Sequence, residues 1–162
     1  MDEFPPAPLD TAARVVTTMV FLLTAFFVFL APRQPRFSPF GAALLLLLPA
    51  VTWGFSIRNY SLEDGKLVIH RPLGSRKIAL SPELTAFQDP DAAKGALRLW
   101  GNGGVFGYYG TFRSGRLGTF SAYATDWKFG VVVKTGGKTF VLTPDDPITF
   151  IARLRETAHT LK

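Results

Sequence analysis

Two long apolar stretches without charged residues constrain the fold of this chain more than any other feature. They cover residues 15–31 (VVTTMVFLLTAFFVFLA) and 40–57 (FGAALLLLLPAVTWGFSI), and a short loop separates them. Each approaches the roughly 20 residues that cross a bilayer core about 30 Å thick. Residues 58–162 supply too little chain to bury two such helices. The sequence therefore predicts an N-terminal tail at 1–14, a hairpin of two transmembrane helices at 15–57, and one small domain at 58–162.

The charges are distributed unevenly between these parts. Residues 1–57 hold three Arg and three acidic residues, whereas residues 58–162 hold 15 Lys or Arg and 9 Asp or Glu. The whole net charge of +6 therefore lies on the C-terminal domain. A basic domain beside a bilayer is attracted to anionic headgroups by about 1 kcal/mol per Lys or Arg near the surface. The alternative is a solvated basic face without a specific partner.

Positive charges near the helix ends predict the topology. The loop between the stretches carries two Arg, while the other side carries Arg14 and the group that follows the second stretch, namely Arg58, Lys66, Arg71, Arg76 and Lys77. This excess favours integration in the inner (cytoplasmic) cell membrane with both termini in the cytoplasm. The acidic, proline-rich N-terminus lacks the basic region and the cleavage site of a secretory signal, so we expect the first stretch to remain as an anchor.

Beyond residue 57 the pattern changes to short β-type runs separated by turns. Asp-Gly at 64–65 and Gly-Gly at 136–137 are typical of β-hairpins. We expect about seven short antiparallel strands. The candidate runs are RNYSL, KLVIHR, RKIAL, 119–125, 129–135 and 138–143, with 84–88 and 97–100 as plausible further strands. Asp145-Asp146-Pro147 is typical of a helix start, and apolar residues follow at helical spacing, which predicts an amphipathic helix at 146–161. The expected fold is α+β, a β-sandwich or open barrel closed by that helix.

Two spans, a bent β-sandwich and a closing helix together resemble the bacterial membrane-anchored PH-like (pleckstrin-homology-like) domain proteins. The matching residues are Tyr60 and Asp64-Gly65 just after the membrane, the centre GNGGVFGYYGTF with the later Tyr123-Ala124-Thr125, and the step Thr143-Pro144-Asp145 into a helix that contains Phe150. The resemblance covers residues from about 57 to the end. It implies a PH-like architecture and carries very little information about activity.

The segment 101–123 (GNGGVFGYYGTFRSGRLGTFSAY) combines seven glycines with large aromatic rings. Rings and Arg suit the boundary between bilayer and water, where rings lie at headgroup depth and guanidinium groups reach phosphate. The candidate binding residues are Phe106, Tyr108, Tyr109, Arg113 and Arg116, together with Arg71, Arg76 and Lys77 from earlier strands. The alternative is that rings fill the sandwich core. We expect this for Phe112, Phe120 and Tyr123, and it stays open for the other three rings and for both Arg.

No motif points to an enzyme. The chain has no cysteine, which excludes disulfides and thiolate metal sites. The two histidines, His70 and His159, have no partner at metal-ligand spacing, and the acidic residues fall at turns and caps. GNGGVFG lacks the last glycine of a dinucleotide fingerprint, and the basic residues are dispersed without a nucleic-acid motif. We therefore expect no catalytic residue, no metal, no cofactor and no nucleic-acid partner.

The expected function is that of a non-catalytic module at the cytoplasmic membrane surface. It binds a protein partner or assembles with copies of itself, and tethering raises the effective concentration so that weak affinity suffices. The alternative is recognition of anionic lipid headgroups by the basic, aromatic face. Convergence of the five basic candidates on one bilayer-facing surface favours lipid. A large exposed patch of Phe106, Tyr108 and Tyr109 favours a protein partner.

Overall fold

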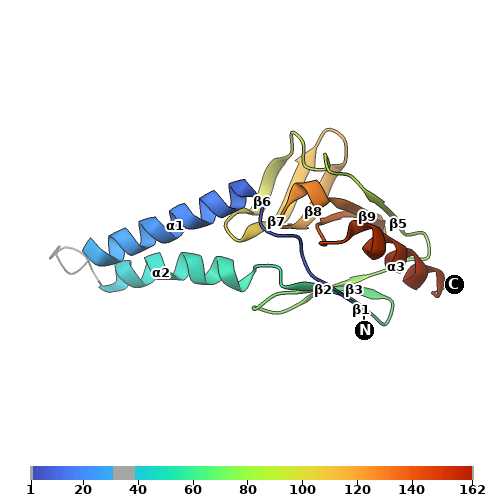
Figure 1. The fold of residues 1–162 in the computed structure, drawn as a ribbon, viewed down its shortest axis with the longest axis horizontal. Helices are drawn as coiled ribbons and strands as arrows, with labels where there is room; N and C mark the ends of the chain where they lie inside the picture. Colours follow the sequence, from blue (N-terminus) through green and yellow to red (C-terminus); the bar gives the residue numbers. More distant parts are fainter. Residues whose placement is uncertain (1, 31–38, 162) are drawn as a thin grey trace.

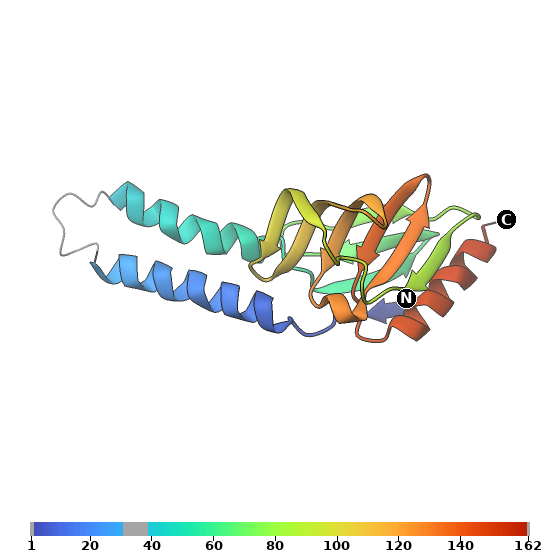
Figure 2. The same ribbon diagram turned by 90° about the horizontal axis from the view of Figure 1, so that it is seen from above.

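Two helices lie side by side and extend from one end of a β domain (Figures 1 and 2). The structure, a computed structural model, describes residues 2–30 and 39–161. Helix α1 covers Thr11–Leu30 and α2 covers Pro39–Gly54. Helix α1 begins before the apolar stretch because Asp10 caps it, accepting a hydrogen bond of 2.7 Å from the Ala13 amide. Helix α2 ends at Gly54, and residues 55–57 of the second stretch lead into the β domain instead.

The two helices differ in how well they fit a bilayer. Of the described helices, α1 is the one that is long and apolar enough to cross a membrane, with a mean hydropathy of 2.1 and 11% of its most apolar window buried. Helix α2 has 16 residues and falls short in length. The expected pair of transmembrane helices is therefore supported, by length and composition, for one helix near the N-terminus.

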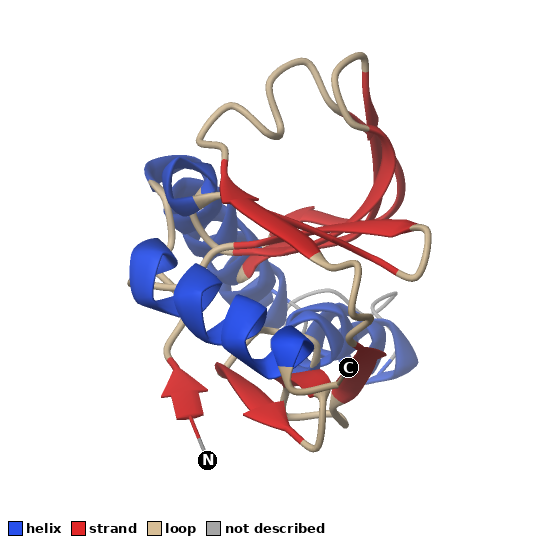
Figure 3. Cartoon of the chain, turned by 90° about the vertical axis from the view of Figure 1, so that its right-hand side faces the viewer, coloured by secondary structure: helices blue, strands red, loops and turns tan. Residues whose placement is uncertain are grey.

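The β domain consists of two sheets. The smaller has the order β1-β2-β3-β4, formed by Asp2–Phe4, Asn59–Glu63, Lys66–His70 and Arg76–Ala79. The larger has the order β5-β9-β10-β8-β7-β6, formed by Thr85–Gln88, Val131–Thr135, Lys138–Leu142, Gly118–Ala124, Gly107–Ser114 and Leu97–Gly104. Figure 3 shows the two sheets one above the other, with helix α3 (Pro147–His159) lying along the opening between them.

Three features differ from the expected strands. Strand β1 lies in the segment expected to be a tail, and it pairs with β2 through Glu3 and Ser61. Strand β7 lies in the glycine-rich segment, where no strand was expected between residues 100 and 119. The expectation of antiparallel strands is wrong for β8 and β10, which pair in parallel. After β8 the chain forms β9, which is separated from β8 by the width of one strand. The β9–β10 hairpin then places β10 between them, so β10 runs parallel to β8.

The core lies between the sheets and is closed by α3. Its fully buried members include Tyr60, Leu67, Ile69, Val131, Val133, Leu142, Phe150 and Leu154. The ring of Phe150 meets that of Phe4 edge-on with centroids 5.1 Å apart, so α3 packs against β1. Arg155 donates to the Ala86 carbonyl at 2.7 Å. The N-cap Asp146 accepts from two amides of the first turn, and α3 lies within the expected range of 146–161.

Candidate functional site

The tip of the β6–β7 hairpin, which belongs to the glycine-aromatic segment, lies against α1. Phe106 at this turn has a positive φ of 57°. Its amide donates to the Thr17 hydroxyl at 2.9 Å, and this hydroxyl donates to the Gly104 carbonyl at 3.3 Å. Its ring meets Phe21 edge-on at 5.7 Å. Phe106 is therefore a contact between the β domain and α1.

Tyr108 joins β7 to the start of α1. Its hydroxyl donates to the two carboxylate oxygens of Asp10 at 3.0 and 3.2 Å. Burial, followed by the negative charge of Asp10 and the hydrogen bond to it, raises the pKa of Tyr108 to about 12. The phenol therefore stays protonated at neutral pH and remains a donor to the residue that caps α1.

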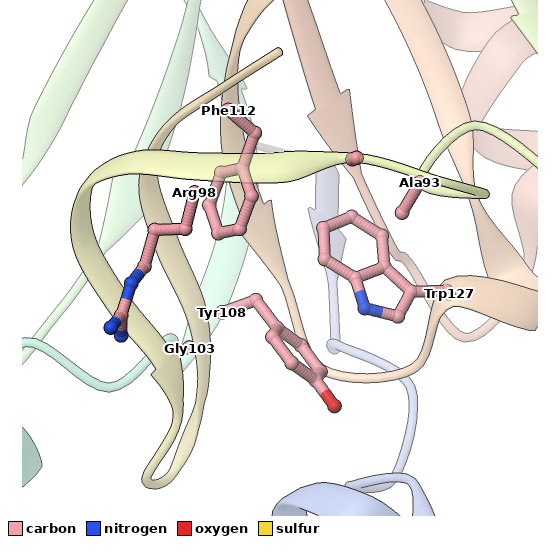
Figure 4. A pocket seen from close by; sticks show the side chains of 7 residues that line it. Ala93, Arg98, Gly103, Tyr108, Phe112 and Trp127 are labelled. Atoms are coloured by element: carbon pink, nitrogen blue, oxygen red, sulfur yellow. The ribbon is translucent and has the colours of Figure 1, made fainter. Parts of the chain in front are cut away.

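Tyr108 also lines a cavity of about 330 Å³ on one face of the larger sheet (Figure 4). In this view the rings of Tyr108, Phe112 and Trp127 gather together, whereas Arg98 extends toward Gly103. The Trp127 ring lies 4.8 Å from Tyr108 and 5.9 Å from Phe112 between centroids. These rings contact one another closely, so the cavity lies at the edge of a packed aromatic cluster.

A larger groove of about 700 Å³ lies between α2 and the other face of the β6–β7 hairpin. Helix α2 contributes an apolar wall that includes Leu48 and Val51, while Arg71 comes from the β3–β4 loop and Arg76 from the start of β4. The larger sheet contributes aromatic and hydroxyl side chains, namely Trp100, Tyr109, Thr111, Ser121 and Tyr123. We call this space, lined by both Arg and by the end of α2, the basic groove. It brings an apolar wall and two cations together.

Three side chains in the basic groove hold one another in place. The ring of Phe55 stacks on Tyr109 with centroids 5.7 Å apart, and the Arg71 guanidinium lies over Phe55 at 5.3 Å. Arg71 also donates through Nε to the Gly74 carbonyl at 3.2 Å. Burial raises the pKa of Tyr109, while the charge of Arg71 acts in the opposite direction. The groove thus presents an oriented guanidinium beside a neutral phenol, which is the chemistry that binds an anion.

The remaining basic candidates lie elsewhere. Lys77 lines another cavity with Arg76, Thr135 and Lys138, to which neither α1 nor α2 contributes. Arg113 and Arg116 lie at the end of β7 opposite to the hairpin tip that meets α1. Arg116 forms an ion pair of 3.1 Å with Asp89. Of the five basic candidates, Arg71 and Arg76 therefore line the basic groove, Lys77 shares its cavity with Arg76, and Arg113 and Arg116 line neither.

The structure also adds residues that the sequence did not single out. Phe55 belongs to the second apolar stretch and Trp100 to an ordinary strand pattern, so neither stood out as a site residue. Trp100 is 79% exposed, an unusual state for the largest apolar side chain. Phe112 and Phe120 are buried as expected, and Tyr123, also expected in the core, is half-buried: it packs against the core cluster and also lines the basic groove.

His70 has neighbours that its sequence position did not indicate. Ser61 lies on the adjacent strand, with its hydroxyl 2.8 Å from His70 Nε2 and 2.8 Å from the Glu63 carboxylate. In a catalytic triad the carboxylate holds the other imidazole nitrogen and the hydroxyl faces the substrate. Here Ser61 is fully buried and binds the carboxylate itself. This arrangement satisfies the polar groups of Ser61 and does not expose a nucleophile.

Comparison with known proteins assigns the β domain. The family described as Bacterial PH domain matches residues 58–158, more than half of the chain. No curated protein and no solved structure matches. The matched range begins just before β2 and ends within α3, so it leaves out β1 and both long helices. The resemblance to bacterial PH-like proteins is thereby confirmed, and the chain belongs to the bacterial PH domain family.

Proposed function

We propose that this chain is a membrane-anchored, non-catalytic module whose basic groove binds the headgroup of an anionic lipid. PH-like domains are in general non-catalytic and often bind lipids or proteins, and this chain contains one. The observation that carries the proposal is the position of Arg71 and Arg76 opposite the apolar end of α2 in a single groove. A lipid has this same division between an anionic head and apolar chains.

The anchoring is argued from the surface of α1. Large apolar side chains along this helix are exposed, among them Met19, Leu22 and Phe26 at 56, 65 and 56%. Exposed apolar surface costs about 25 cal/mol per Å² in water, whereas lipid tails accept it. A core helix of a soluble domain is mostly buried. We therefore propose that α1 lies in a bilayer.

Helix α2 lies beside α1 and also exposes apolar residues, including Leu46, Leu47 and Leu48. We propose that both helices form a hairpin in the inner (cytoplasmic) membrane. The β domain and both termini then lie on the cytoplasmic side, since the Arg and Lys that follow α2 favour that side. In this arrangement the domain-proximal end of α2, which lines the basic groove, lies at the headgroup level.

Side chains at this level suit a membrane interface. The Arg58 guanidinium lies over the Trp53 ring at 5.2 Å, which pairs an interfacial aromatic with a cation. Within the groove, Arg71 and Arg76 are placed to meet phosphate, for which guanidinium groups have matching geometry. Leu48 and Val51 are placed to meet the first segments of the acyl chains.

A protein partner is supported less well by the same residues. Phe106, Tyr108 and Tyr109 are each half-buried, because they pack on Phe21, on Trp127 and on Phe55 respectively. The exposed patch of these three rings that favours a protein interface is not formed by the described residues. Of the candidate set, Arg71, Arg76 and Tyr109 line the basic groove together.

The test measures lipid retention by the full chain, since β1 and α1 complete the β domain. The protein is purified in a mild detergent and mixed with phosphatidylglycerol or phosphatidylcholine, and bound lipid is counted by native mass spectrometry. The double variant Arg71→Gln, Arg76→Gln should retain about 10- to 30-fold less phosphatidylglycerol, since each cation contributes about 1 kcal/mol near a headgroup. The matched control is Lys94→Gln, Lys134→Gln, which removes the same charge from exposed side chains that do not line the groove.

Specific retention of phosphatidylglycerol by the wild type and by the control, with loss in the groove variant, supports the proposal. Equal retention by all three proteins contradicts it. Equal retention of both lipids by the wild type also contradicts it, because the groove then does not recognise the headgroup charge.

A further inference from the structure

Strand β6 is a free edge of the larger sheet, and it is the strand nearest to the helices. The order of that sheet runs from β6 beside α1 and α2 to β5 at the far end of the molecule (Figures 1 and 2). At one end of β6, Gly104 lies against Val16 of α1. Further along, Trp100 shares the basic groove with Leu48 and Val51 of α2. The strand therefore passes across the domain-proximal parts of both helices.

The outer part of this edge is apolar and exposed. Leu97, Leu99 and Trp100 are 72, 57 and 79% exposed. The register of β6 against β7 shifts between Arg98 and Trp100, so Leu99 lies at a β-bulge without a paired residue in β7. Proteins usually protect an edge strand with charges, proline or a covering element, because an apolar edge promotes aggregation. Arg98 is the single charged residue in this strand, which gives the edge little protection of its own. We therefore expect another surface to cover it.

We infer that this surface is the bilayer itself, and that residues 97–100 lie on it at headgroup depth with Trp100 in the interface. The inference rests on the proposed placement of α1 and α2 in the membrane. The apolar surface is continuous from α2 to the edge, because Leu48 and Val51 face the same groove as Trp100. Trp and Leu beside a cation are the composition of an interfacial segment.

The unpaired backbone of β6 limits the depth of this contact. Free N–H and C=O groups of an edge strand cannot be satisfied in hydrocarbon, whereas water and headgroups at the interface accept them. Trp100 and the two leucines therefore reach the upper acyl region while the strand backbone stays at headgroup level. The contact would fix the orientation of the β domain above the membrane and hold the mouth of the basic groove against lipid.

The experiment uses spin labels, for which the absence of cysteine in the chain is an advantage. Leu99→Cys reports the β6 edge, and Leu22→Cys reports the exposed middle of α1. Ile148→Cys is the matched control, an apolar residue that is 76% exposed on α3, away from the long helices. The labelled full-length proteins are reconstituted into phosphatidylcholine vesicles, and collision rates with oxygen and with a water-soluble nickel chelate are measured.

The expected result is a ratio of oxygen to nickel collisions at Leu99 that is several-fold higher than at Ile148 and below that at Leu22. A water-like ratio at Leu99 with a lipid-like ratio at Leu22 overturns the inference and leaves the anchoring intact. Water-like ratios at both positions refute the anchoring as well. Protection of Leu99 from both reagents, with spin–spin broadening, overturns the inference in favour of a second copy on the β6 edge.

Headgroup recognition is tested apart from this contact. Phosphatidylcholine carries no net charge, so attraction of the basic groove to a net anionic headgroup does not contribute to a lipid-like ratio at Leu99 in these vesicles. Repeating the measurement with Arg71→Gln, Arg76→Gln should leave the ratio at Leu99 unchanged. If the ratio at Leu99 falls to that at Ile148 in this variant, the apolar contact of the β6 edge is not independent of the groove cations, and the inference is overturned.

Discussion

Asp10, Thr17 and Tyr108 connect α1 to the β domain through side-chain hydrogen bonds. Asp10 caps the helix and accepts from the Tyr108 hydroxyl, while Thr17 binds both the amide of Phe106 and the carbonyl of Gly104. These polar contacts orient α1 relative to the β6–β7 hairpin. Sequence patterns did not reveal them, because the partners are about 90 residues apart and a Tyr in a glycine-rich segment has no unique partner.

The first prediction concerns the hydroxyl of Tyr108. Tyr108→Phe should destabilise the protein by about 1–3 kcal/mol, since it removes a hydrogen bond to a carboxylate. Tyr109→Phe is the matched control, because the Tyr109 hydroxyl has no hydrogen-bond partner among the described residues, and it should change stability little. Thermal unfolding in detergent, followed by near-UV circular dichroism, measures both. Equal melting temperatures for the two variants contradict the prediction.

Alkaline pH should destabilise the folded protein. An unfolded Tyr ionises near pH 10, whereas burial and Asp10 raise the pKa of Tyr108 to about 12, and burial also raises the pKa values of Tyr60 and Tyr109. Between these values the unfolded chain releases protons that the folded chain retains, so the free energy of unfolding falls as pH rises. This stability is fully present below about pH 10 and is lost toward about pH 12.

Melting temperatures measured at increasing pH, together with tyrosinate absorbance, check this dependence. The expected result is a fall in melting temperature that starts near pH 10, with tyrosinate appearing as the protein unfolds. Complete ionisation of all four tyrosines near pH 10 without unfolding contradicts it.

At the scale of elements, glycines make the β6–β7 hairpin possible. Gly101 and Gly110 face each other across the two strands, with φ values of 105° and 130°. A Cβ on either one would overlap a carbonyl oxygen of the opposite strand. This close approach explains why β7 was not predicted. Its glycines are typical of a loop, whereas here they allow β6 and β7 to approach more closely than side chains would permit.

Gly110→Ala should destabilise the protein by at least about 2 kcal/mol, because alanine at this φ is strained and its Cβ collides with the backbone of Trp100. Gly115→Ala is the control in the β7–β8 turn, with open space around the new Cβ and no positive φ, and it should be neutral or slightly stabilising. Chemical denaturation of the two variants decides. Equal stabilities mean that the close contact does not constrain the hairpin.

At the scale of the whole molecule, the N-terminal segment contacts the β domain at several points before α1 begins. Strand β1 pairs with β2, the Ala7 amide donates to the Thr143 carbonyl at 2.8 Å, and the Asp10 amide donates to the Thr125 carbonyl at 3.1 Å. The chain therefore crosses the β domain before entering α1 and returns to it after α2. The domain is held at both ends of the helical pair, which restricts its orientation relative to the two helices.

Phe4→Ala should destabilise the β domain by about 2–4 kcal/mol, somewhat less than a fully buried Phe, because the side chain is 9% exposed and packs on Phe150. Phe4→Leu keeps most of the apolar volume and should cost less than half as much. Hydrogen exchange of the amides in β2 and α3 measures the effect where β1 packs. Unchanged protection in the Phe4→Ala variant indicates that β1 does not contribute to the fold.

Local patterns in the sequence determined much of this protein. The length and apolar composition of the first stretch predicted a helix that is long and apolar enough to cross a bilayer, because both properties depend on the local sequence alone. Asp64-Gly65 predicted the β2–β3 hairpin, since both residues have the positive φ that such a turn requires. Asp146 and Pro147 predicted the start of α3 through capping. The family resemblance followed from the same motifs.

The tertiary structure decided what depends on distant partners. A short N-terminal strand such as β1 has no recognisable pattern until β2 is beside it, and the parallel pairing of β8 with β10 depends on the path between them. Charge counts could not show which cations share a surface. Arg71 and Arg76 line one groove beside α2 because the two sheets and the end of that helix lie close together there, whereas Arg113 and Arg116 do not line it.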